Sequence, residues 1–296
     1  MRDHIIGIEA VDARGEVFKG GGRVVKNVAG YDFCRLLTGS MGTLGVISQV
    51  TLKLSPMVAE TRIVACQIHD WDQAERLLAA LVESATTPVA IEIVAGAEWS
   101  SRLGESESTN DGVAYLLVGL EGTKVEVEWM EQTLADEWAS LDAQVFATFS
   151  NADVSQRNRS TTADELWSGL TEFPAEPNAA LVLKATTLPS AVARFASAAL
   201  QLDSKCSLQC HAGNGVTIMR FADYPEEGLS RILLSKLAPL AAESGGNVTI
   251  LSNPAGSEST KQSVWGGIDA PFDLMTAIKH KFDPQNLLNP GRFVYA

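Results

Sequence analysis

The stretch that decides the fold of the N-terminal part reads Lys-Asn-Val-Ala-Gly-Tyr-Asp at 26–32 and Gly-Ser-Met-Gly-Thr-Leu-Gly-Val-Ile at 39–47. Glycines recur at every third position of the second segment. Because glycine has no Cβ, it permits positive φ and leaves backbone amides open to a ligand. The alternating apolar run at 46–54 predicts the strand that holds them. The spacing alone fits both a glycine-rich turn and a surface where the backbone approaches a flat or phosphorylated molecule.

The N-terminal residues predict a β-hairpin. Apolar residues alternate from position 5, a turn follows at 12–15, and the pattern resumes at Val17. Because the hairpin begins so early, we expect the chain to start inside a domain. We therefore expect the apolar strand faces that carry Ile6, Ile8 and Val17 to lack cover, which favours self-association or a companion chain.

The middle of the chain predicts two copies of a β-α-β-β-α-β unit, the split βαβ or ferredoxin-like arrangement. The first copy has strands at 61–69, 89–95, 114–120 and 143–149, helices from Asp70 to Val82 and at 124–141, and a polar loop at 98–111. The second copy has strands at 180–186, 206–211, 216–221 and 247–252, and helices at 189–200 and 226–243. A linker at 151–177 carries a short helix at 164–170 and joins the copies, which we expect to share one sheet.

Composition limits the function classes. The 296 residues carry a net charge of −13 and are 46% hydrophobic, which fits a multi-part globular chain and disfavours nucleic acid or an anionic membrane as partner. The sequence predicts no transmembrane segment and no signal peptide, so a cytoplasmic location is the default.

The sequence predicts no metal site. Cys206, Cys210 and His211 are close in sequence, but the run 205–210 alternates with period two, which places both cysteines and Leu208 on one strand face. Zinc needs three or four convergent ligands. A buried apolar strand face with reduced thiols is the favoured interpretation.

Four motifs in order resemble a known family. They are Gly-Gly-Arg-Val-Val-Lys-Asn-Val-Ala-Gly-Tyr-Asp at 21–32, the glycine segment at 39–47, His-Ala-Gly-Asn-Gly at 211–215 and Phe-Asp-Pro-Gln-Asn-Leu-Leu-Asn-Pro-Gly-Arg-Phe at 282–293. Together they resemble the vanillyl-alcohol oxidase and p-cresol methylhydroxylase superfamily of FAD-binding proteins, and within it most closely the E subunit of bacterial glycolate oxidase.

This resemblance implies an α+β fold in three parts. Residues 1–56 would be the C-terminal part of an FAD-binding domain of the p-cresol methylhydroxylase type. Residues 57–268 would be the duplicated ferredoxin-like cap, or substrate domain. Residues 269–296 would be a C-terminal helix and tail that return to the flavin site.

The resemblance also implies FAD as the cofactor and assigns its contacts. The expected cofactor-binding residues are Lys26, Asn27, Gly39, Ser40, Met41, Gly42, Thr43, Leu44, Gly45, Val46, Ile47 and Asn289. The family also carries an upstream subdomain whose glycine-rich loop cradles the FAD pyrophosphate, and we expect this loop to be missing from the 296 residues. A deliberate truncation, a misplaced start codon and a naturally shortened subunit all fit this expectation.

His211 is the first candidate catalytic residue. The Gly-Asn-Gly that follows it predicts a tight hairpin with positive φ. In relatives of the glycolate and D-lactate dehydrogenase type, a similar His-x-Gly-Asp-Gly hairpin faces the flavin, so the resemblance implies that His211 steers a carboxylate or takes a hydroxyl proton. Asn214 replaces the acidic residue here, and a purely structural hairpin histidine remains the alternative.

The C-terminal residues predict an amphipathic helix at 271–281, with Asp269 as a candidate N-cap and Asp283-Pro284 as the stop. The resemblance implies that Asn289 hydrogen-bonds the isoalloxazine edge. It further implies that Arg292, the second candidate catalytic residue, meets a substrate carboxylate or a flavin phosphate. A solvated tail is the alternative.

Two functions follow as hypotheses. The first is a subunit of an FAD-dependent oxidoreductase that oxidises a small 2-hydroxy acid, such as glycolate to glyoxylate, in a complex with a companion flavoprotein and an iron–sulfur subunit. The second is a non-catalytic scaffold or assembly subunit that has lost competent FAD binding. The expected absence of the pyrophosphate loop and the presence of Asn214 favour the second for the chain in isolation.

Overall fold

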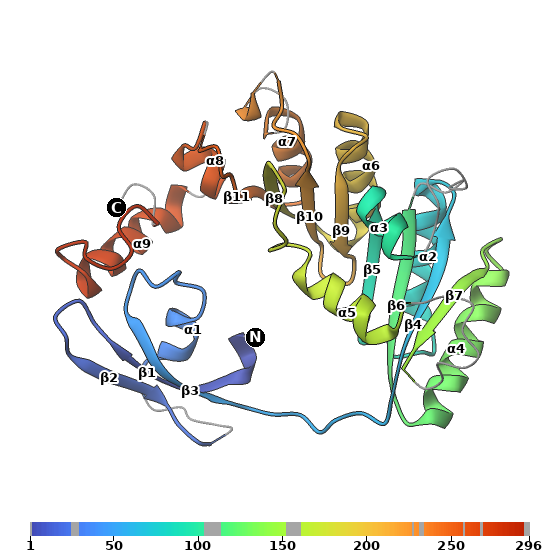
Figure 1. Cartoon of the computed structure of the whole chain (residues 1–296), viewed down its shortest axis with the longest axis horizontal. Helices are drawn as coiled ribbons and strands as arrows, with labels where there is room; N and C mark the ends of the chain where they lie inside the picture. Colours follow the sequence, from blue (N-terminus) through green and yellow to red (C-terminus); the bar gives the residue numbers. More distant parts are fainter. Residues whose placement is uncertain are drawn as a thin grey trace. The chain divides into compact units, whose positions relative to one another are not determined.

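The computed structural model describes most of the chain (Figure 1). The described residues are 2–24, 30–103, 114–151, 161–226, 228–230, 234–256, 258–266 and 269–292. The chain divides into two compact units. The N-terminal unit consists of residues 1–57, 260–262 and 267–296, and the larger unit consists of residues 58–259 and 263–266.

A three-stranded antiparallel sheet of order β2-β1-β3 forms the N-terminal unit. One face is covered by two helices that are far apart in sequence, α1 and α9. Phe282 at the end of α9 packs against Phe18 of β2, with ring centroids 5.8 Å apart. The elements of this unit are η1 (Arg2–His4), β1 (Ile5–Val11), β2 (Val17–Gly21), α1 (Phe33–Leu37), β3 (Val46–Leu52) and α9 (Asp269–Phe282).

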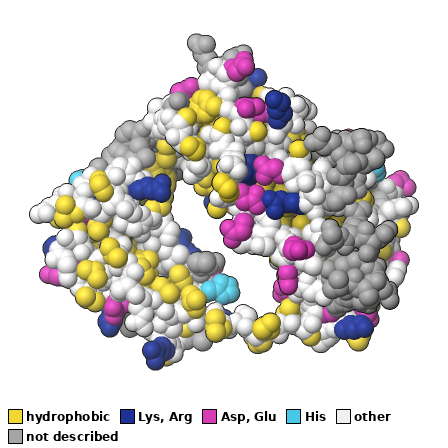
Figure 2. All heavy atoms as spheres, viewed as in Figure 1, with side chains coloured by type: hydrophobic (Ala, Val, Ile, Leu, Met, Phe, Trp, Pro, Cys, Tyr) yellow, Lys and Arg dark blue, Asp and Glu magenta, His cyan; other side chains and the backbone are white. Residues whose placement is uncertain are grey.

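The predicted hairpin is present, but its expected lack of cover is wrong for Ile8. This side chain is buried beneath α1 and α9, because the C-terminal helix supplies a cover that no local pattern could indicate. Val17, in contrast, is 60% exposed, and β3 exposes Val46, Ile47, Val50 and Leu52. Figure 2 shows hydrophobic side chains at the surface of this unit.

The larger unit is built on one eight-stranded sheet of order β11-β8-β10-β9-β5-β6-β4-β7. Its strands are β4 (Glu60–Ile68), β5 (Ala90–Ala95), β6 (Ala114–Gly122), β7 (Val145–Ser150), β8 (Leu181–Thr186), β9 (Ser207–His211), β10 (Val216–Phe221) and β11 (Asn247–Ser252). Its helices are α2 (Trp71–Glu83), α3 (Ala97–Arg102), α4 (Lys124–Ala139), α5 (Ala163–Glu172), η4 (Pro189–Ala191), α6 (Val192–Leu202) and α7 (Ser235–Glu243). The short helix α8 (Lys261–Trp265) is divided between the two units.

The predicted duplication is confirmed by the strand order. The first four strands are arranged β7-β4-β6-β5 and the second four β11-β8-β10-β9, so each half has its fourth strand outermost and its second strand innermost. The halves join where β5 pairs antiparallel with β9. The predicted α+β class with two β-α-β-β-α-β copies on one sheet is therefore correct.

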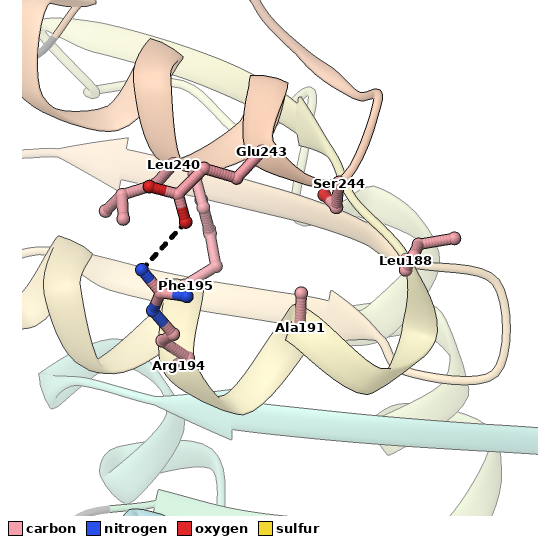
Figure 3. A pocket seen from close by; sticks show the side chains of 7 residues that line it. All are labelled: Leu188, Ala191, Arg194, Phe195, Leu240, Glu243 and Ser244. Carbon is pink, nitrogen blue, oxygen red and sulfur yellow. Dashed lines mark hydrogen bonds and ion pairs between the residues drawn. The ribbon is translucent and has the colours of Figure 1, made fainter.

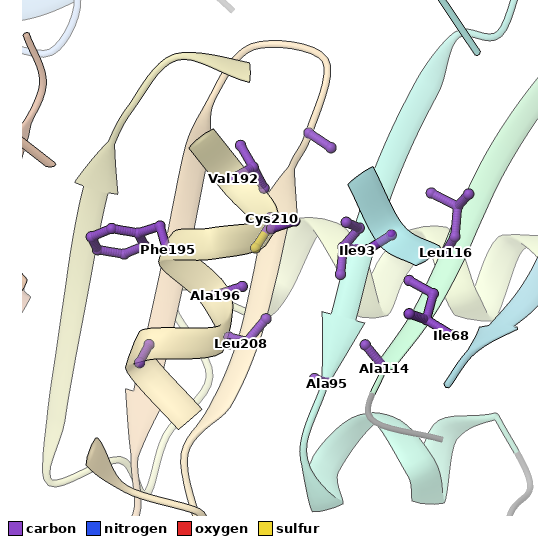
Figure 4. Close-up of a cluster of buried hydrophobic side chains, with 14 of the residues drawn as sticks. Ile68, Ile93, Ala95, Ala114, Leu116, Val192, Phe195, Ala196, Leu208 and Cys210 are labelled. Carbon is purple, nitrogen blue, oxygen red and sulfur yellow. The ribbon is translucent and has the colours of Figure 1, made fainter. Parts of the chain in front are cut away.

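The core lies on both faces of this sheet. On one face, α2, α4, α6 and α7 pack over the largest cluster of buried side chains, part of which is drawn in Figure 4 with Ile93, Phe195 and Cys210. On the other face, α3 and α5 cover a second cluster that contains Trp99 and Phe173. Cys206 and Cys210 are fully buried in the first cluster, which confirms their strand-face interpretation, and burial raises the pKa of the Cys210 thiol to about 12.

The N-cap predicted at Asp70 is confirmed. Asp70 caps α2 by accepting a 2.7 Å hydrogen bond from the amide of Gln73. Among the described residues, no helix is long and apolar enough to cross a membrane. The same residues contain no group of three or more His, Cys, Asp or Glu arranged to hold a metal ion.

Other local expectations were wrong. The stretch predicted as a polar loop at 98–111 begins with α3, which forms because Trp99 and Leu103 bury against the sheet; a polar sequence this short gives no helical period. Helices α1 and α8, of five residues each, were missed for the same reason. Helix α9 extends over Asp269–Phe282, which is longer than the predicted 271–281.

Candidate functional site in the glycine loop and the hairpin

The predicted cofactor segment forms a turn between α1 and β3, residues 38–45, which we call the glycine loop. Gly39, Met41 and Gly42 have φ values of +87°, +55° and +69°. The amides of Ser40 and Thr43 close two turns, donating to the carbonyls of Leu37 and Ser40. Within the described part of the chain, the amides of Gly39, Met41 and Gly42 have no hydrogen-bond acceptor. Open amides of this kind suit an anionic or carbonyl oxygen of a ligand.

The three glycines of the loop serve different purposes. A Cβ on Gly42 would lie 2.7 Å from Nδ2 of Asn289, and one on Gly45 would lie 3.2 Å from the carbonyl oxygen of Val11. The protein's own atoms thus explain two glycines that we had expected to make room for the flavin. A Cβ on Gly39 would meet no heavy atom within 4 Å, so the open side of the loop is at Gly39.

The C-terminal tail lies directly on this loop. Asn289 donates a 2.7 Å hydrogen bond from Nδ2 to the carbonyl oxygen of Met41. This bond uses one N–H of the amide. The side chain of Asn289 is exposed, so its second N–H and its Oδ1 can still meet a ligand. Arg292 is exposed, and its backbone amide donates to the carbonyl of Asn289 in a turn.

A buried ion pair fixes the tail to the loop, and we call it the Lys279–Asp283 clamp. Lys279 Nζ lies 2.6 Å from Asp283 Oδ2, and the two side chains are 3% and 0% exposed. The same ammonium donates to the carbonyls of Thr43 and Leu288. Burial alone would raise the pKa of Asp283, but the hydrogen bonds from Lys279 and from the amides of Leu288 and Leu287 outweigh it and lower that pKa.

The residues around the loop fit a flavin nucleotide in part. The open amides and the free space at Gly39 can approach a flat ring edge or a phosphate. Thr43 and Leu44 are buried and offer only backbone, while Val46 and Ile47 are exposed at the start of β3. Two further predicted contacts, Lys26 and Asn27, lie outside the described residues.

His211, the candidate catalytic histidine, belongs to the larger unit and lies at the end of β9. Its Nδ1 is 2.8 Å from Oε1 of Glu92, the residue opposite it on β5. Gln209 donates to the other oxygen of Glu92 at 3.2 Å. The hydrogen bond to Glu92 raises the pKa of His211; desolvation and the charge of Lys184 oppose this, and the charge of Glu92 adds to it.

The hairpin after His211 needs only one of its two glycines. Gly215 has a φ of +73°, and a Cβ there would lie 2.0 Å from the carbonyl oxygen of Thr187. Gly213 has an ordinary φ and open space around it. The amides of Asn214 and Gly215 both donate to the carbonyl of His211, so the turn fixes the backbone at the histidine.

A shallow pocket of about 250 Å³ lies elsewhere on the larger unit, between α6 and α7 (Figure 3). An ion pair of 2.8 Å between Arg194 and Glu243 spans it. These helices pack on the sheet face that buries Cys210, whereas His211 points to the opposite face because successive strand residues alternate. The pocket contains none of the predicted site residues.

Sequence reasoning missed Glu92, Lys279 and Asp283. Glu92 stands alone in the apolar strand 89–95, and a lone carboxylate in such a run was a signal that could have been used. Lys279 and Asp283 are spaced i, i+4 at a helix end, which is typical of exposed pairs. Their burial depends on the glycine loop, so the sequence carried no local sign of it.

Comparison with known proteins matches residues 58–293 to the family described as FAD linked oxidases, C-terminal domain. The D-lactate dehydrogenase of Archaeoglobus fulgidus is 28% identical over 99% of this chain and 65% of its own length. Glycolate oxidase subunit GlcD of Bacillus subtilis is 27% identical over 98% of this chain and 63% of its own length. The chain thus spans just under two thirds of these curated relatives.

We expected the E subunit of glycolate oxidase to be the main relative, and the comparisons do not support this. Glycolate oxidase subunit GlcE of Escherichia coli is 43% identical, but over only 56 residues, or 19% of this chain. Short glycine-rich motifs carried that expectation, whereas the D-subunit match extends through both halves of the sheet. Among solved structures, p-cresol methylhydroxylase with substrate bound has a TM-score of 0.64 over 98% of this chain and 65% of its own, at 16% identity, which shows a shared fold.

Proposed function

Since the chain belongs to the family of FAD linked oxidases, whose C-terminal domain it contains, we propose that it works in a flavoprotein that oxidises a small 2-hydroxy acid. The relatives named glycolate oxidase subunit and D-lactate dehydrogenase support this substrate class. Glycolate, oxidised to glyoxylate, is our specific proposal. FAD, when bound, supplies the acceptor for the hydride of the substrate α-carbon.

The observation that carries the proposal for cofactor binding is the glycine loop with its unpaired amides. Gly39 and the amides of Met41 and Gly42 would hold the flavin nucleotide, and the Lys279–Asp283 clamp would keep that surface rigid. Asn289, which gives one N–H to Met41, would meet the isoalloxazine edge with the remaining N–H or the carbonyl oxygen of its side chain. In the larger unit, His211 would meet the hydroxy acid. In the N-terminal unit, Arg292 would meet a flavin phosphate.

The proposal includes partners. We propose a companion flavoprotein and an iron–sulfur subunit that receive the electrons, by analogy with relatives named as subunits of glycolate oxidase. The exposed apolar residues of β3 support an additional contact surface on the N-terminal unit.

A second candidate function is a scaffold subunit without competent FAD binding. One observation favours it. The protein's own atoms, from Asn289 and Val11, occupy the space beside Gly42 and Gly45, which leaves less of the loop for a cofactor than the motif implies.

FAD titration tests the proposal. We expect the 296-residue chain to bind FAD weakly or not at all and a version extended upstream to bind it tightly, because the glycine loop reaches only part of a dinucleotide. Gly39→Asn tests whether the cofactor lies beside Gly39. Asparagine tolerates positive φ, and its side chain would enter the open space that the cofactor would occupy. In the extended protein, we expect Gly39→Asn to weaken FAD binding.

Gly245→Asn is the matched control, because Gly245 also has positive φ and open space but lies in the larger unit. Unchanged FAD content in the extended Gly39→Asn protein would refute this placement of the cofactor. An extended protein that takes up no FAD at all would favour the scaffold function.

A further inference from the structure

A carboxylate and a histidine face each other at the junction of the two halves of the large sheet. Glu92 of β5 and His211 of β9 are directly opposite partners in the antiparallel pairing. Their side chains are 9% and 34% exposed. Gln209, which is fully buried, donates a second hydrogen bond to Glu92. Glu92 is therefore held at both oxygens, and only the histidine reaches solvent.

The charge balance of this pair determines which form of the histidine the site favours. A buried carboxylate is costly unless a cation compensates it. Among the described residues, Glu92 has no Lys or Arg partner, so His211 is its only available counter-charge. The hydrogen bond to Glu92 raises the pKa of His211, in agreement with an imidazolium at this place.

A second cation lies on the same face of the sheet. Lys184 of β8 is opposite Ile218 of β10, which is in turn opposite Gln209 of β9, so Lys184 and Gln209 point the same way. Lys184 is close enough that its charge acts on the pKa of His211. It forms no ion pair with any residue that the structure describes. A cation without a partner beside an imidazolium makes this face suited to an anion.

The other residues near His211 do not neutralise the positive charge of His211 and Lys184. Val216, its partner on β10, is apolar. Arg220, further along β10, is buried and occupied by Glu98 and by the carbonyls of Phe173, Glu176 and Pro177.

We propose that Glu92 is a positioning residue that holds His211 as an imidazolium, and that His211 and Lys184 together bind the carboxylate of the 2-hydroxy acid. This inference rests on the proposed function and deepens it, because it gives His211 the carboxylate-binding role rather than that of the base. Nδ1 is engaged by Glu92, so the N–H at Nε2 is the donor available to the substrate.

Nuclear magnetic resonance of the histidine rings tests both parts of the proposal, the positioning of His211 by Glu92 and the binding of the carboxylate. It requires neither flavin nor turnover. The chain has only four histidines, and His211→Gln identifies the signal of His211. In Glu92→Gln we expect the pKa of His211 to fall by about one unit or more, because the carboxylate charge is lost while the shape is kept. Glu75→Gln, on the exposed side of α2, should leave that pKa unchanged. An unchanged value in Glu92→Gln overturns the positioning role.

Carboxylate binding is tested by adding glycolate or D-lactate to the same protein, with glycolamide and lactamide as neutral controls. We expect the two carboxylates to shift the His211 signals and the amides to leave them in place. Lys184→Gln should weaken carboxylate binding about tenfold, the loss of roughly one ion pair in a partly shielded site. Lys236→Gln on α7 is the matched control. Equal responses to acid and amide, or no response to either, overturn the inference.

Turnover of the FAD-loaded extended protein separates the two proposals. Binding by an imidazolium predicts that KM rises as the pH passes above the pKa of His211, with kcat retained. If kcat/KM instead rises with pH through that pKa, His211 is a base and the inference is wrong, although the proposed function stands. If carboxylates bind at His211 but no 2-hydroxy acid is oxidised, the inference stands and the proposed function fails.

Discussion

The side-chain amide of Asn289 donates a 2.7 Å hydrogen bond to the carbonyl oxygen of Met41, across 248 positions of sequence. This bond joins the C-terminal tail to the glycine loop, and the Lys279–Asp283 clamp lies beneath it with Lys279 bound to the carbonyls of Thr43 and Leu288. The loop and the tail therefore form a single surface, and changes in either should act on both.

The first prediction concerns Gly42. In Gly42→Ala the new Cβ would approach Nδ2 of Asn289 to 2.7 Å at a φ of +69°, so we expect a loss of about 1–3 kcal/mol in the free energy of unfolding. In an Asn289→Ala background the clash disappears and only the backbone strain remains. A double-mutant cycle by chemical denaturation should therefore show coupling between the two sites. Strictly additive effects would contradict the close contact.

The second prediction concerns the clamp. Lys279→Met would leave Asp283 buried without its cation, and we expect a loss of about 3–5 kcal/mol in the free energy of unfolding. Lys281→Met, on the exposed side of the same helix, is the control and should change stability by less than about 0.5 kcal/mol. A Lys279→Met protein as stable as this control would show that the pair is not held as described.

The clamp also predicts that the stability of the fold depends on pH. The pKa of Asp283 is lowered in the folded chain, so its contribution to stability is complete above the ordinary carboxyl pKa of about 4 and is lost as the pH falls through the lower folded value. Denaturation curves recorded from neutral to acid pH should show this loss in the wild type. The loss should be smaller in Asp283→Asn; an identical acid profile in the two proteins would contradict the prediction.

The third prediction compares the two glycines of the hairpin after His211. Gly215→Ala combines a positive φ with a Cβ 2.0 Å from the carbonyl oxygen of Thr187, and we expect it to cost at least about 1–3 kcal/mol. Gly213→Ala has open space and an ordinary φ, so its effect should stay within about 0.5 kcal/mol. Thermal unfolding of both variants checks the difference, and equal melting temperatures would contradict the turn geometry.

The fourth prediction concerns association. Strand β3 is at one edge of its sheet and exposes Val46, Ile47, Val50 and Leu52, so we expect the chain to self-associate or to require a companion subunit. Val50→Lys should reduce the associated fraction measured by light scattering. Val125→Lys, at an exposed position of α4, should not. A monodisperse wild-type monomer at tens of micromolar that binds no dye for apolar surfaces would count decisively against this surface.

The sequence carried most of the fold of the larger unit. Strands such as Asn247–Ser252 and capped helices such as the one after Asp70 have clear periods and end signals, and their order predicted the duplicated sheet. The sequence did not indicate α3, whose helix depends on the burial of Trp99 against strands distant in sequence. Tertiary contacts determine such short elements, and no local period records them.

The candidate site could be predicted only in part. The motifs indicated the glycine loop, His211 and Asn289, because those residues lie in recognisable patterns. Glu92 was hidden because its partner is 119 positions away on another strand. The assignment of Gly42 to the flavin was also incomplete, because the sequence could not indicate that Asn289 fills the space beside it.

Anaerobic absorbance spectroscopy of the FAD-loaded extended protein tests the central claim most directly. If the chain works in a flavoprotein that oxidises a small 2-hydroxy acid, adding glycolate or D-lactate should bleach the long-wavelength flavin band, while acetate and propionate, which lack the hydroxyl, should leave it unchanged. A flavin that stays oxidised in the presence of every small 2-hydroxy acid tried, although a chemical reductant bleaches it, would contradict the account.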